Sequence, residues 1–297
     1  MAQVPAAANS PAPALRLPLN PETAPSEKAR GMAHLTAKFA TSDSQPVRQG
    51  VQWRVFEEAP GPDGSHKLVA QSSDAMPTLP LPDGNFIVHA ALGLAGATKR
   101  ITINGTLLSE TLVLNAGGLK ITGHLGDTPV NPAKLSISIY VPERVNPEAK
   151  LVAANAKSGD TIGLPEGNYH VVSTLLDTAN NGSASPTNSV ISADLRVQAG
   201  KLTDATLRHR AASMTLKLVN ALGGEALANT AFTVLTPGGD VIREMIGAFP
   251  SATLAEGEYV AIARHNGKTY QTTFKVESSL DRDVEVLAKE AGPPATP

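Results

Sequence analysis

Short stretches in which hydrophobic and polar residues alternate recur along most of the chain, and they predict β-strands. The alternation is clearest in residues 135–139 and 215–218, where every second side chain is apolar. A period of two places the apolar side chains on one face of a strand, as in a sheet that packs against a core on one side only. Because helical periodicity is weak throughout, the pattern predicts an all-β fold made of β-sandwiches.

One phrase of six residues occurs three times, at residues 81–86, 164–169 and 254–259. The copies read Leu-Pro-Asp-Gly-Asn-Phe, Leu-Pro-Glu-Gly-Asn-Tyr and Leu-Ala-Glu-Gly-Glu-Tyr. The Pro, the acidic residue and the Gly favour a turn, whereas the aromatic residue and the β-branched residues behind it favour a strand. The phrase therefore predicts a turn that leads into a strand, once in each of three repeats.

Strand-like runs flank each copy of the phrase, so that each repeat of ~85 residues contains about six or seven strands. In the first repeat we expect strands at residues 34–39, 51–58, 67–72, 98–103 and 110–114. The corresponding runs are 119–123, 134–141, 150–154, 190–197 and 202–207 in the second repeat, and 214–219, 231–236, 241–246, 268–276 and 283–287 in the third. We therefore predict β-sandwich modules at residues 31–116, 117–211 and 212–290, joined by short loops at 115–118 and 208–213.

Both ends of the chain differ in composition from these modules. Residues 1–30 are rich in Pro and Ala and have almost no large apolar side chains after Leu19. Such a segment cannot bury enough surface to offset the entropy that is lost on ordering. We expect a disordered Pro/Ala-rich tail at residues 1–30 and a second disordered tail at 291–297.

The repeated phrase, followed by an apolar strand, resembles carboxypeptidase-regulatory-like repeats, which are also described as transthyretin-like or prealbumin-like sandwiches. The copy that continues to Val172 is the most similar, and the copy at Leu254 departs from the pattern because Ala255 stands in place of Pro. Residues 31–289 also look like exported cell-envelope proteins of alphaproteobacteria. The resemblance implies three tandem immunoglobulin-like or transthyretin-like modules that serve as accessory, adhesive or spacer domains, and it implies no particular activity.

Composition and charge exclude several classes of function. The 297 residues hold 25 Lys and Arg against 27 Asp and Glu, so the chain lacks the basic excess that is typical of nucleic-acid-binding proteins. The absence of Cys excludes disulfides, Cys-ligated zinc, iron–sulfur clusters and thiol catalysis. No apolar run approaches the ~18 residues of a membrane-spanning helix. We expect neither a nucleic-acid partner nor a membrane span.

No catalytic, cofactor-binding or metal-binding motif emerges from the remaining pattern. No two of the seven His are spaced as a metal-binding pair. A site built into the repeat should recur, but the third repeat has Val260 and Ile262 at the strand positions of His170 and His89. Residues 177–182, from Asp177 to Gly182, hint at a calcium loop but lack a ligand at the third position, and the alternative is a polar loop between strands. We predict no enzyme, no cofactor and no resident metal.

Three aromatic residues are candidates for a contact surface. Trp53 alternates with Val51 and Val55 on one strand face, which is typical of a core residue; the alternative is an exposed platform that stacks on carbohydrate. Phe56 and Tyr140 fall on the opposite strand face, at equivalent places in the first two repeats. Exposed aromatic residues at these places would mark a surface that contacts a partner.

A small basic cluster, formed by Arg208, His209 and Arg210, lies at the junction of the second and third predicted modules. One interpretation is a solvated linker. The other is a contact with the neighbouring module or with an anionic ligand. We therefore include the three residues among the candidate contacts.

These observations favour a non-enzymatic, exported structural or interaction protein, which serves as a spacer or assembly platform with protein partners in a bacterial cell envelope. The start, Met-Ala-Gln before a Pro/Ala-rich stretch, is typical of an exported protein from which a signal peptide has been removed; the alternative is a cytoplasmic protein with a low-complexity tail. A second hypothesis is binding of glycan or another envelope polymer through Trp53, Phe56 or Tyr140. A third is an enzyme with an unrecognised site between modules.

Overall fold

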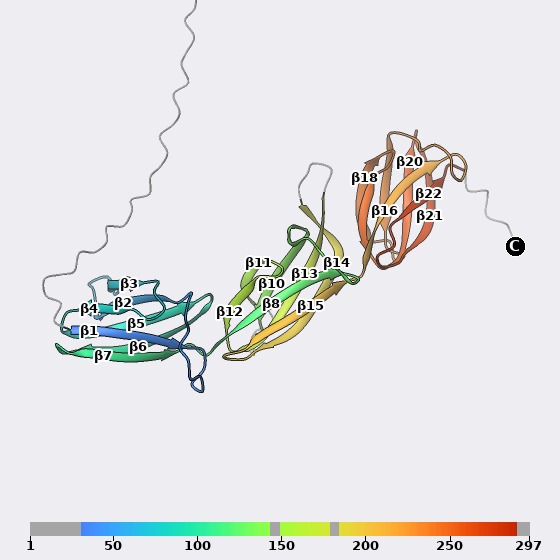
Figure 1. Ribbon diagram of the computed structural model, residues 1–297. Coiled ribbons are helices and arrows are strands. Elements are labelled where there is room, and N and C mark those ends of the chain that lie inside the picture. The colour runs from blue at the N-terminus through green and yellow to red at the C-terminus, as the bar shows by residue number, and fades with distance from the viewer. Residues whose placement is uncertain (1–30, 143–148, 179–183, 290–297) are drawn as a thin grey trace, which may run out of the picture.

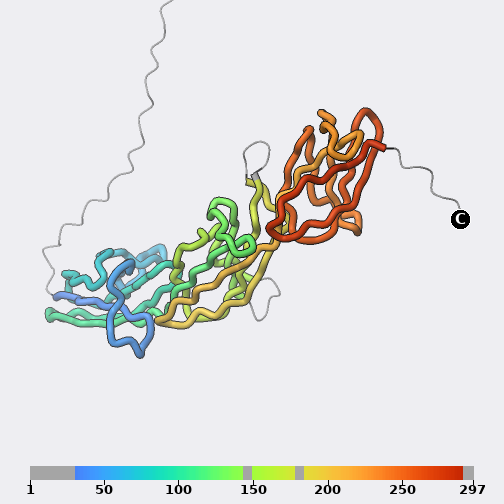
Figure 2. Tube along the Cα trace, turned by 45° about the vertical axis from the view of Figure 1, so that its right-hand side comes forward, coloured from blue at the N-terminus to red at the C-terminus, as the bar shows by residue number. Residues whose placement is uncertain are grey.

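Three β-sandwiches follow one another in a row in the computed structural model, which describes residues 31–142, 149–178 and 184–289 (Figures 1 and 2). Each sandwich encloses its own hydrophobic cluster, and the clusters span residues 33–116, 119–211 and 212–286. We refer to the three sandwiches as modules 1, 2 and 3. The predicted all-β fold of tandem sandwiches is confirmed, whereas both predicted tails lie outside the described residues.

Module 1 has seven strands in two sheets. They are β1 (Gly31–Lys38), β2 (Gln52–Pro60), β3 (His66–Ser72), β4 (Thr78–Leu81), β5 (Gly84–Leu92), β6 (Ala95–Ile103) and β7 (Leu107–Val113). The order is β4-β1-β7 in the three-stranded sheet and β3-β2-β5-β6 in the four-stranded sheet. All neighbours are antiparallel except β1 and β7, which run parallel.

Modules 2 and 3 repeat this topology. Module 2 contains β8 (Ala116–Leu125), β9 (Thr128–Pro129), the 3-10 turn η1 (Pro132–Lys134), β10 (Leu135–Val141), β11 (Lys150–Ala156), β12 (Thr161–Pro165), β13 (Gly167–Thr178), β14 (Ala184–Val197) and β15 (Leu202–His209). Module 3 contains β16 (Ala211–Val219), β17 (Thr230–Leu235), β18 (Val241–Gly247), β19 (Ser251–Ala255), β20 (Gly257–His265), β21 (Lys268–Val276) and β22 (Arg282–Leu287). The sheets β12-β8-β15 and β19-β16-β22 correspond to the three-stranded sheet of module 1, and we call them three-stranded although the short β9 also pairs with β8 in module 2. The four-stranded sheets are β11-β10-β13-β14 and β18-β17-β20-β21.

The alternating sequence pattern explains how each core is filled. The strands β2, β10 and β17 occupy the same place in their sheets, and they bury Trp53, Ile137 and Phe232 at the same position. The residues between the buried positions face outward and are partly exposed. Each four-stranded sheet therefore has one face on the core and one face toward solvent, as the period of two predicts.

The repeated phrase does more than form a turn. Its first residues, Leu81, Leu164 and Leu254, are buried in strands of the three-stranded sheets, whereas its aromatic residue lies in a strand of the four-stranded sheet. The phrase is therefore the crossing from one sheet to the other. The strands that precede the crossing, β4, β12 and β19, are missing from the sequence prediction because they are only four or five residues long and follow polar stretches.

The crossing is fixed by its glycine and by its aromatic residue. Gly84 and Gly257 have φ angles of 153° and 157°, which residues with a Cβ rarely adopt. The hydroxyl of Tyr169 donates to the Pro165 carbonyl at 2.8 Å, and that of Tyr259 donates to the Ala255 carbonyl at 2.8 Å. The same short hydrogen bond thus holds the crossing in modules 2 and 3.

The connections between modules are shorter than the sequence predicts. Only residues 114 and 115 separate β7 from β8, and only Arg210 separates β15 from β16. Ala116 and Ala211, which open β8 and β16, are fully buried and belong to the core of the preceding module. The predicted loop at 208–213 is therefore wrong, because strand pairing continues through almost all of it.

Candidate functional site

Trp53 lies in the core of module 1. Its side chain is 1% exposed, and the indole Nε1 donates to the carbonyl of Asp74 at 3.1 Å. A buried indole with its one polar atom satisfied is a packing element. The core interpretation of Trp53 is confirmed, and its assignment to a contact surface and carbohydrate platform is wrong.

Phe56 and Tyr140 do lie on an outer surface. Phe56, on β2, is partly exposed and stands directly opposite Leu68 on β3 and Ile87 on β5. Residues that are paired across antiparallel strands point to the same face of the sheet, with their Cβ atoms within ~5.5 Å of each other. The three side chains therefore form an apolar row across the outer face of the four-stranded sheet.

The same row occurs in modules 2 and 3. Tyr140 stands opposite Leu151 and His170, and Leu235 stands opposite Val241 and Val260. The outermost member is the most exposed one in each module, at 45% for Leu68, 49% for Leu151 and 56% for Val241. We call these nine residues the outer-face row: Leu68, Phe56, Ile87, Leu151, Tyr140, His170, Val241, Leu235 and Val260.

A β-bulge accompanies the outer-face row in every module. The pairing between β2 and β3 shifts at Phe56, that between β10 and β11 at Tyr140, and that between β17 and β18 at Leu235. The extra residues are Val69, Val152 and Ile242, and all three pack against the core of their module. A bulge bends the edge strand and blunts its capacity to pair with another strand.

Sequence reasoning found only part of this surface. It identified Phe56 and Tyr140 because they are aromatic, and it overlooked Leu235 because the third repeat has an aliphatic residue there. Aligning the predicted strand at 231–236 with those at 51–58 and 134–141 would have found Leu235. The partners across the sheet depend on strand register, which the bulges displace and which the sequence pattern alone does not specify.

The basic cluster at residues 208–210 is divided between different environments. Arg208 points outward and pairs with Asp127 of its own module, with 2.7 Å between Nη1 and Oδ1. Arg210 makes two hydrogen bonds of 2.9 and 2.8 Å to the carboxylate of Glu256 in module 3. The predicted contact with the neighbouring module is therefore present for Arg210, but the three residues do not form one cationic patch.

His209 points inward and is fully buried in module 2, so its assignment to a contact surface is wrong. Its Nε2 lies 2.9 Å from Ser173 Oγ, and its Nδ1 lies 3.0 Å from Ser189 Oγ. Burial lowers the pKa of His209 below its ordinary value of 6.5, and a hydrogen bond with the Ser189 backbone opposes this shift. A Ser–His pair can serve as nucleophile and base, but this one is enclosed by the core, so its role is structural.

Side chains hold the junction between modules 2 and 3. The Asp177 carboxylate, at the end of β13, accepts the Thr253 amide hydrogen at 2.8 Å. The Asn188 side chain accepts from the Ala255 amide at 2.9 Å and donates to the Tyr259 hydroxyl at 2.7 Å. Because β13 and β14 are 12 and 14 residues long, their side chains extend onto β19 and β20 of the next module.

The junction between modules 1 and 2 is made by backbone groups instead. The Leu94 amide, at the tip of the β5–β6 hairpin, donates to the Gly163 carbonyl of β12 at 2.9 Å. Gly93 and Gly163 pack backbone to backbone, and a Cβ on Gly93 would lie 2.8 Å from the Gly163 oxygen. Glycine is required here because any side chain would separate the two modules.

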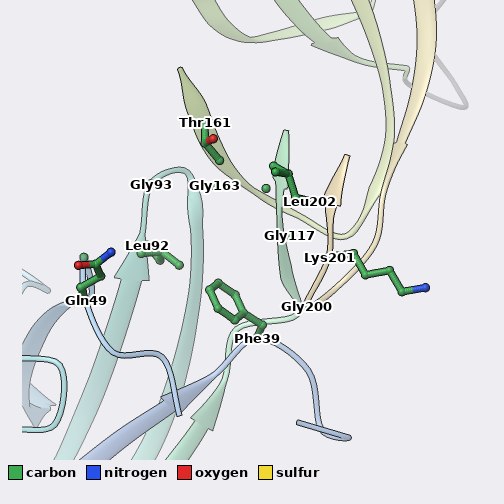
Figure 3. A pocket seen from close by; sticks show the side chains of 12 residues that line it. Phe39, Gln49, Leu92, Gly93, Gly117, Thr161, Gly163, Gly200, Lys201 and Leu202 are labelled. Atoms are coloured by element: carbon green, nitrogen blue, oxygen red, sulfur yellow. The ribbon is translucent and has the colours of Figure 1, made fainter. Parts of the chain in front are cut away.

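A cleft of about 750 Å³ opens beside this junction (Figure 3). Phe39 and Leu92 of module 1 and Thr161 and Leu202 of module 2 lie around it, whereas the Lys201 side chain points away. Six glycines leave the space open: Gly50, Gly93, Gly117, Gly118, Gly163 and Gly200. The cleft is mainly apolar and holds no acid–base pair among its lining residues.

The structure offers no metal site within the residues that it describes. No group of three His, Asp or Glu in these ranges could hold a metal ion. Residues 179–182 of the suggested calcium loop lie outside the described residues, so calcium binding there stays untested. Asp177 itself is bonded to module 3. Among the described residues, no helix is long and apolar enough to cross a membrane.

Comparison with known proteins finds a family match for one part of the chain. Residues 213–288, which lie in module 3, match the sequence profile of the Rhizobiales growth-associated tandem repeat domain. Rhizobiales are alphaproteobacteria, in keeping with the predicted resemblance to alphaproteobacterial proteins. The resemblance to carboxypeptidase-regulatory-like or transthyretin-like repeats stays a prediction. No curated protein matches the chain.

Three solved structures resemble the chain at low TM-scores. The TIE protein of Bacillus anthracis is 18% identical at a TM-score of 0.26, and the match covers 87% of this chain and 50% of that protein. The minor pilin GBS52 of Streptococcus agalactiae is 14% identical at 0.30, with 60% and 95% covered. A streptococcal ancillary pilin is 11% identical at 0.31, with 88% and 99% covered. The chain thus spans half the length of the Bacillus anthracis protein, and likenesses this distant do not bear on function.

Proposed function

We propose that this chain is a non-enzymatic assembly protein of a bacterial cell envelope, in which three β-sandwich modules present the outer-face row to protein partners. The observation that carries the proposal is the recurrence of the row. The same three cross-strand positions are apolar or aromatic in all three modules, apart from His170, and the same bulge accompanies each of them. Solvent exposure alone gives no reason for this pattern to be repeated three times.

The connections between modules support a role in assembly. Strand β8 follows β7 after two intervening residues, and β16 follows β15 after one, so the connections that space successive rows are short. All of these strands belong to three-stranded sheets. The linkers therefore leave the outer faces of the four-stranded sheets uncovered. A row of linked modules can bind a repeated partner surface with high avidity although each contact is weak.

Export to the envelope is part of the proposal, and it rests on the residues before module 1 and on the match of module 3 to a growth-associated repeat of Rhizobiales. The experiment is fractionation of native cells that carry an epitope-tagged chain. We expect the chain in the periplasmic or surface fraction and retained on isolated envelopes. A chain found only in the cytosol would contradict the proposal.

A matched pair of variants tests the role of the row. The row variant is L68T/L151T/V241T, which changes the most exposed row residue in each module. The control variant, L107T/L202T/L280T, changes three leucines outside the four-stranded sheets, which are 64%, 56% and 47% exposed. We expect the row variant to lose envelope retention and the control to keep it. Retention that depends on polysaccharide and survives protease treatment of the envelope would favour the glycan hypothesis instead.

A further inference from the structure

We propose that His209 makes the junction between modules 2 and 3 sensitive to acid: when this side chain takes up a proton, the junction opens while the rest of module 2 stays folded. His209 is the last residue of β15, and only Arg210 separates it from β16 of module 3 (Figure 1). The acid response does not involve the outer-face row, so it is independent of the proposed function.

The imidazole ring of His209 is enclosed together with its two partners. His209 and Ser173 are fully buried, and Ser189 is 4% exposed. The ring nitrogens lie 2.9 Å from Ser173 Oγ and 3.0 Å from Ser189 Oγ. A neutral ring fits two hydroxyls, because one ring nitrogen donates a hydrogen bond and the other accepts one. The arrangement therefore holds the uncharged form of His209.

A proton on this buried ring would disturb the arrangement. Both ring nitrogens would then donate, so the hydroxyl that donated to the ring would have to turn and leave its hydrogen without that acceptor. Tyr169 is the titratable member of the hydrophobic cluster of module 2, and its hydroxyl is already bonded to the Pro165 carbonyl. A buried charge without a counter-charge is strongly unfavourable. Protonation therefore favours a state in which water reaches the ring.

The charged side chains on the strands around His209 do not supply a counter-charge. Those on β8, β13, β14 and β15 that point outward form ion pairs within module 2, which are Lys120 with Asp204, His170 with Asp194, and Arg208 with Asp127. His124 on β8 and Arg196 on β14 also occupy outward-facing positions. Asp177, at the end of β13, is bonded to Thr253 of module 3.

The strands that enclose the ring also hold module 3, through the residues next to its partners. On β14, Asn188 precedes Ser189, and its side chain bonds an amide and a hydroxyl of module 3. On the other side, Arg210 follows His209, and its carbonyl accepts the Glu256 amide hydrogen of module 3 at 2.9 Å. The hydrogen bond between Ser189 and His209 therefore joins the two supports of module 3.

The opening that exposes the ring can be local. His209 ends its strand, and strand ends open at a lower free energy than a whole module. Water reaches the ring when the end of β15 parts from β14, and then Asn188 and Arg210 cannot both keep their bonds to module 3. The first junction lacks this device, because Leu114 occupies the place of His209 in module 1. Acid should therefore loosen the second junction and leave the first one intact.

Hydrogen exchange of the full chain at pH 7.5 and pH 5 tests the proposal, with each rate expressed as a protection factor to remove the intrinsic effect of pH. We expect the amides of Thr253, Ala255 and Glu256 to lose protection by about 10- to 30-fold at pH 5, because the open state takes up the proton at the ordinary pKa of about 6.5. The Leu94 amide at the first junction and the amides of β10 should keep their protection.

Two variants remove the titration. His209→Gln retains a hydrogen-bonding side chain, and His209→Leu introduces the residue that module 1 has at this place. In either variant the junction amides should be equally protected at both pH values, and circular dichroism at each pH confirms the fold. His170→Gln, which removes an exposed His of the same module, is the control and should respond like the wild type.

Unchanged protection of the junction amides in the wild type, or a response that persists in a folded His209 variant, would overturn the proposal. So would an equal loss of protection in β10, because it would mean that module 2 unfolds as a whole. If neither variant folds, NMR titration of the His209 ring in the wild type decides. The loss of junction protection should have the same midpoint as protonation of this ring, and a different midpoint would contradict the proposal.

Discussion

The two junctions between modules follow the same backbone path but are held by different chemistry. At both, the acidic residue of the repeated phrase donates its amide hydrogen to the linker, from Glu166 to Asn115 at 2.7 Å and from Glu256 to Arg210 at 2.9 Å. The difference lies in the hairpin that reaches forward from the preceding module. In the first junction this hairpin contacts the backbone of Gly163. In the second junction it makes hydrogen bonds through the side chains of Asp177 and Asn188.

This difference shows that the contacts between neighbouring modules can change while the fold of each module stays the same. Gly163 and Thr253 occupy the same position, in the middle of β12 and β19. The β5–β6 hairpin of module 1 meets β12 with backbone groups there, and the cleft of Figure 3 opens beside this contact. The longer β13–β14 hairpin extends polar side chains onto module 3. We therefore expect the second junction to be stiffer than the first.

The largest expected effect comes from His209, which ends the strand that leads into the second junction. The apolar residue Leu114 occupies the equivalent place before the first junction and is 3% exposed. His209→Ala should destabilise module 2 by about 3 kcal/mol, because it leaves a cavity and removes the partners of two buried hydroxyls. Urea denaturation measures the loss. A cost as small as that of a surface substitution would show that the Ser–His–Ser arrangement is not part of the core.

His209 also gives module 2 a pH dependence that module 1 lacks at this position. Its pKa is lowered in the folded module, so the unfolded chain binds the proton first as the pH falls. This contribution to stability is complete above about pH 6.5 and is lost as the pH falls through the lower pKa of the folded state. The difference in unfolding free energy between pH 7.5 and 5 should be smaller in His209→Ala than in the wild type. An equal pH dependence of the two proteins would contradict this assignment.

The next effect is expected at Asp177, which gives the second junction one of its side-chain bonds. Asp177→Ala removes the acceptor of the Thr253 amide and a carboxylate 3.9 Å from Arg243 Nη2. The loss should be about 1–2 kcal/mol for a partly buried, charge-assisted bond. Faster hydrogen exchange at the Thr253 amide reports the loosened junction. Asp204→Ala, which removes an exposed ion pair with Lys120, is the matched control and should leave that amide unchanged.

A smaller effect on stability, but a clear one on geometry, is expected at the first junction. A Cβ on Gly163 would lie 2.9 Å from the Leu92 oxygen, so Gly163→Ala should push the β5–β6 tip away. The free energy of unfolding should change by about 1 kcal/mol or less, because the strain is relieved by movement of the modules. Exchange of the Leu94 amide should accelerate. Gly238→Ala is the control, since its added Cβ meets nothing closer than 3.6 Å.

The smallest effect is expected at the ion pair of Arg210 and Glu256. Both side chains are on the surface, and exposed pairs contribute about 0–1 kcal/mol. Arg210→Ala should therefore change stability by less than about 1 kcal/mol, and 1 M salt should abolish the difference. Arg208→Ala, within module 2, should behave in the same way. A loss that is larger and insensitive to salt would mean that Arg210 stabilises the second junction by packing as well as by charge.

The sequence predicted the features that depend on short-range pattern. Alternation located the strands of each core, and the recurrence of one phrase showed the three repeats. The strands β4, β12 and β19 escaped detection because they are short and pair across long sequence separations. Only the structure distinguishes the buried aromatic residue from the exposed ones. The burial of Trp53 and the exposure of Phe56 depend on which strand face meets the core.

Other features could not follow from the sequence because they depend on contacts between distant segments. His209 looked like a member of a basic cluster, and only its position opposite Ser173 and Ser189 shows that it is a core residue. The outer-face row requires strand register and bulges, which no local pattern encodes. The hydrogen bond between Thr253 and Asp177 joins residues 76 positions apart.

If the outer-face row acts as a single repeated interaction surface, one affinity should report it most directly. It is the affinity of the tagged chain for isolated envelopes when the row is removed from one, two or three modules by Leu68→Thr, Leu151→Thr and Val241→Thr in every combination. Each further substitution should weaken the affinity by a similar factor, whichever module it lies in. Complete loss from one module alone, or full affinity in the triple variant, would contradict it.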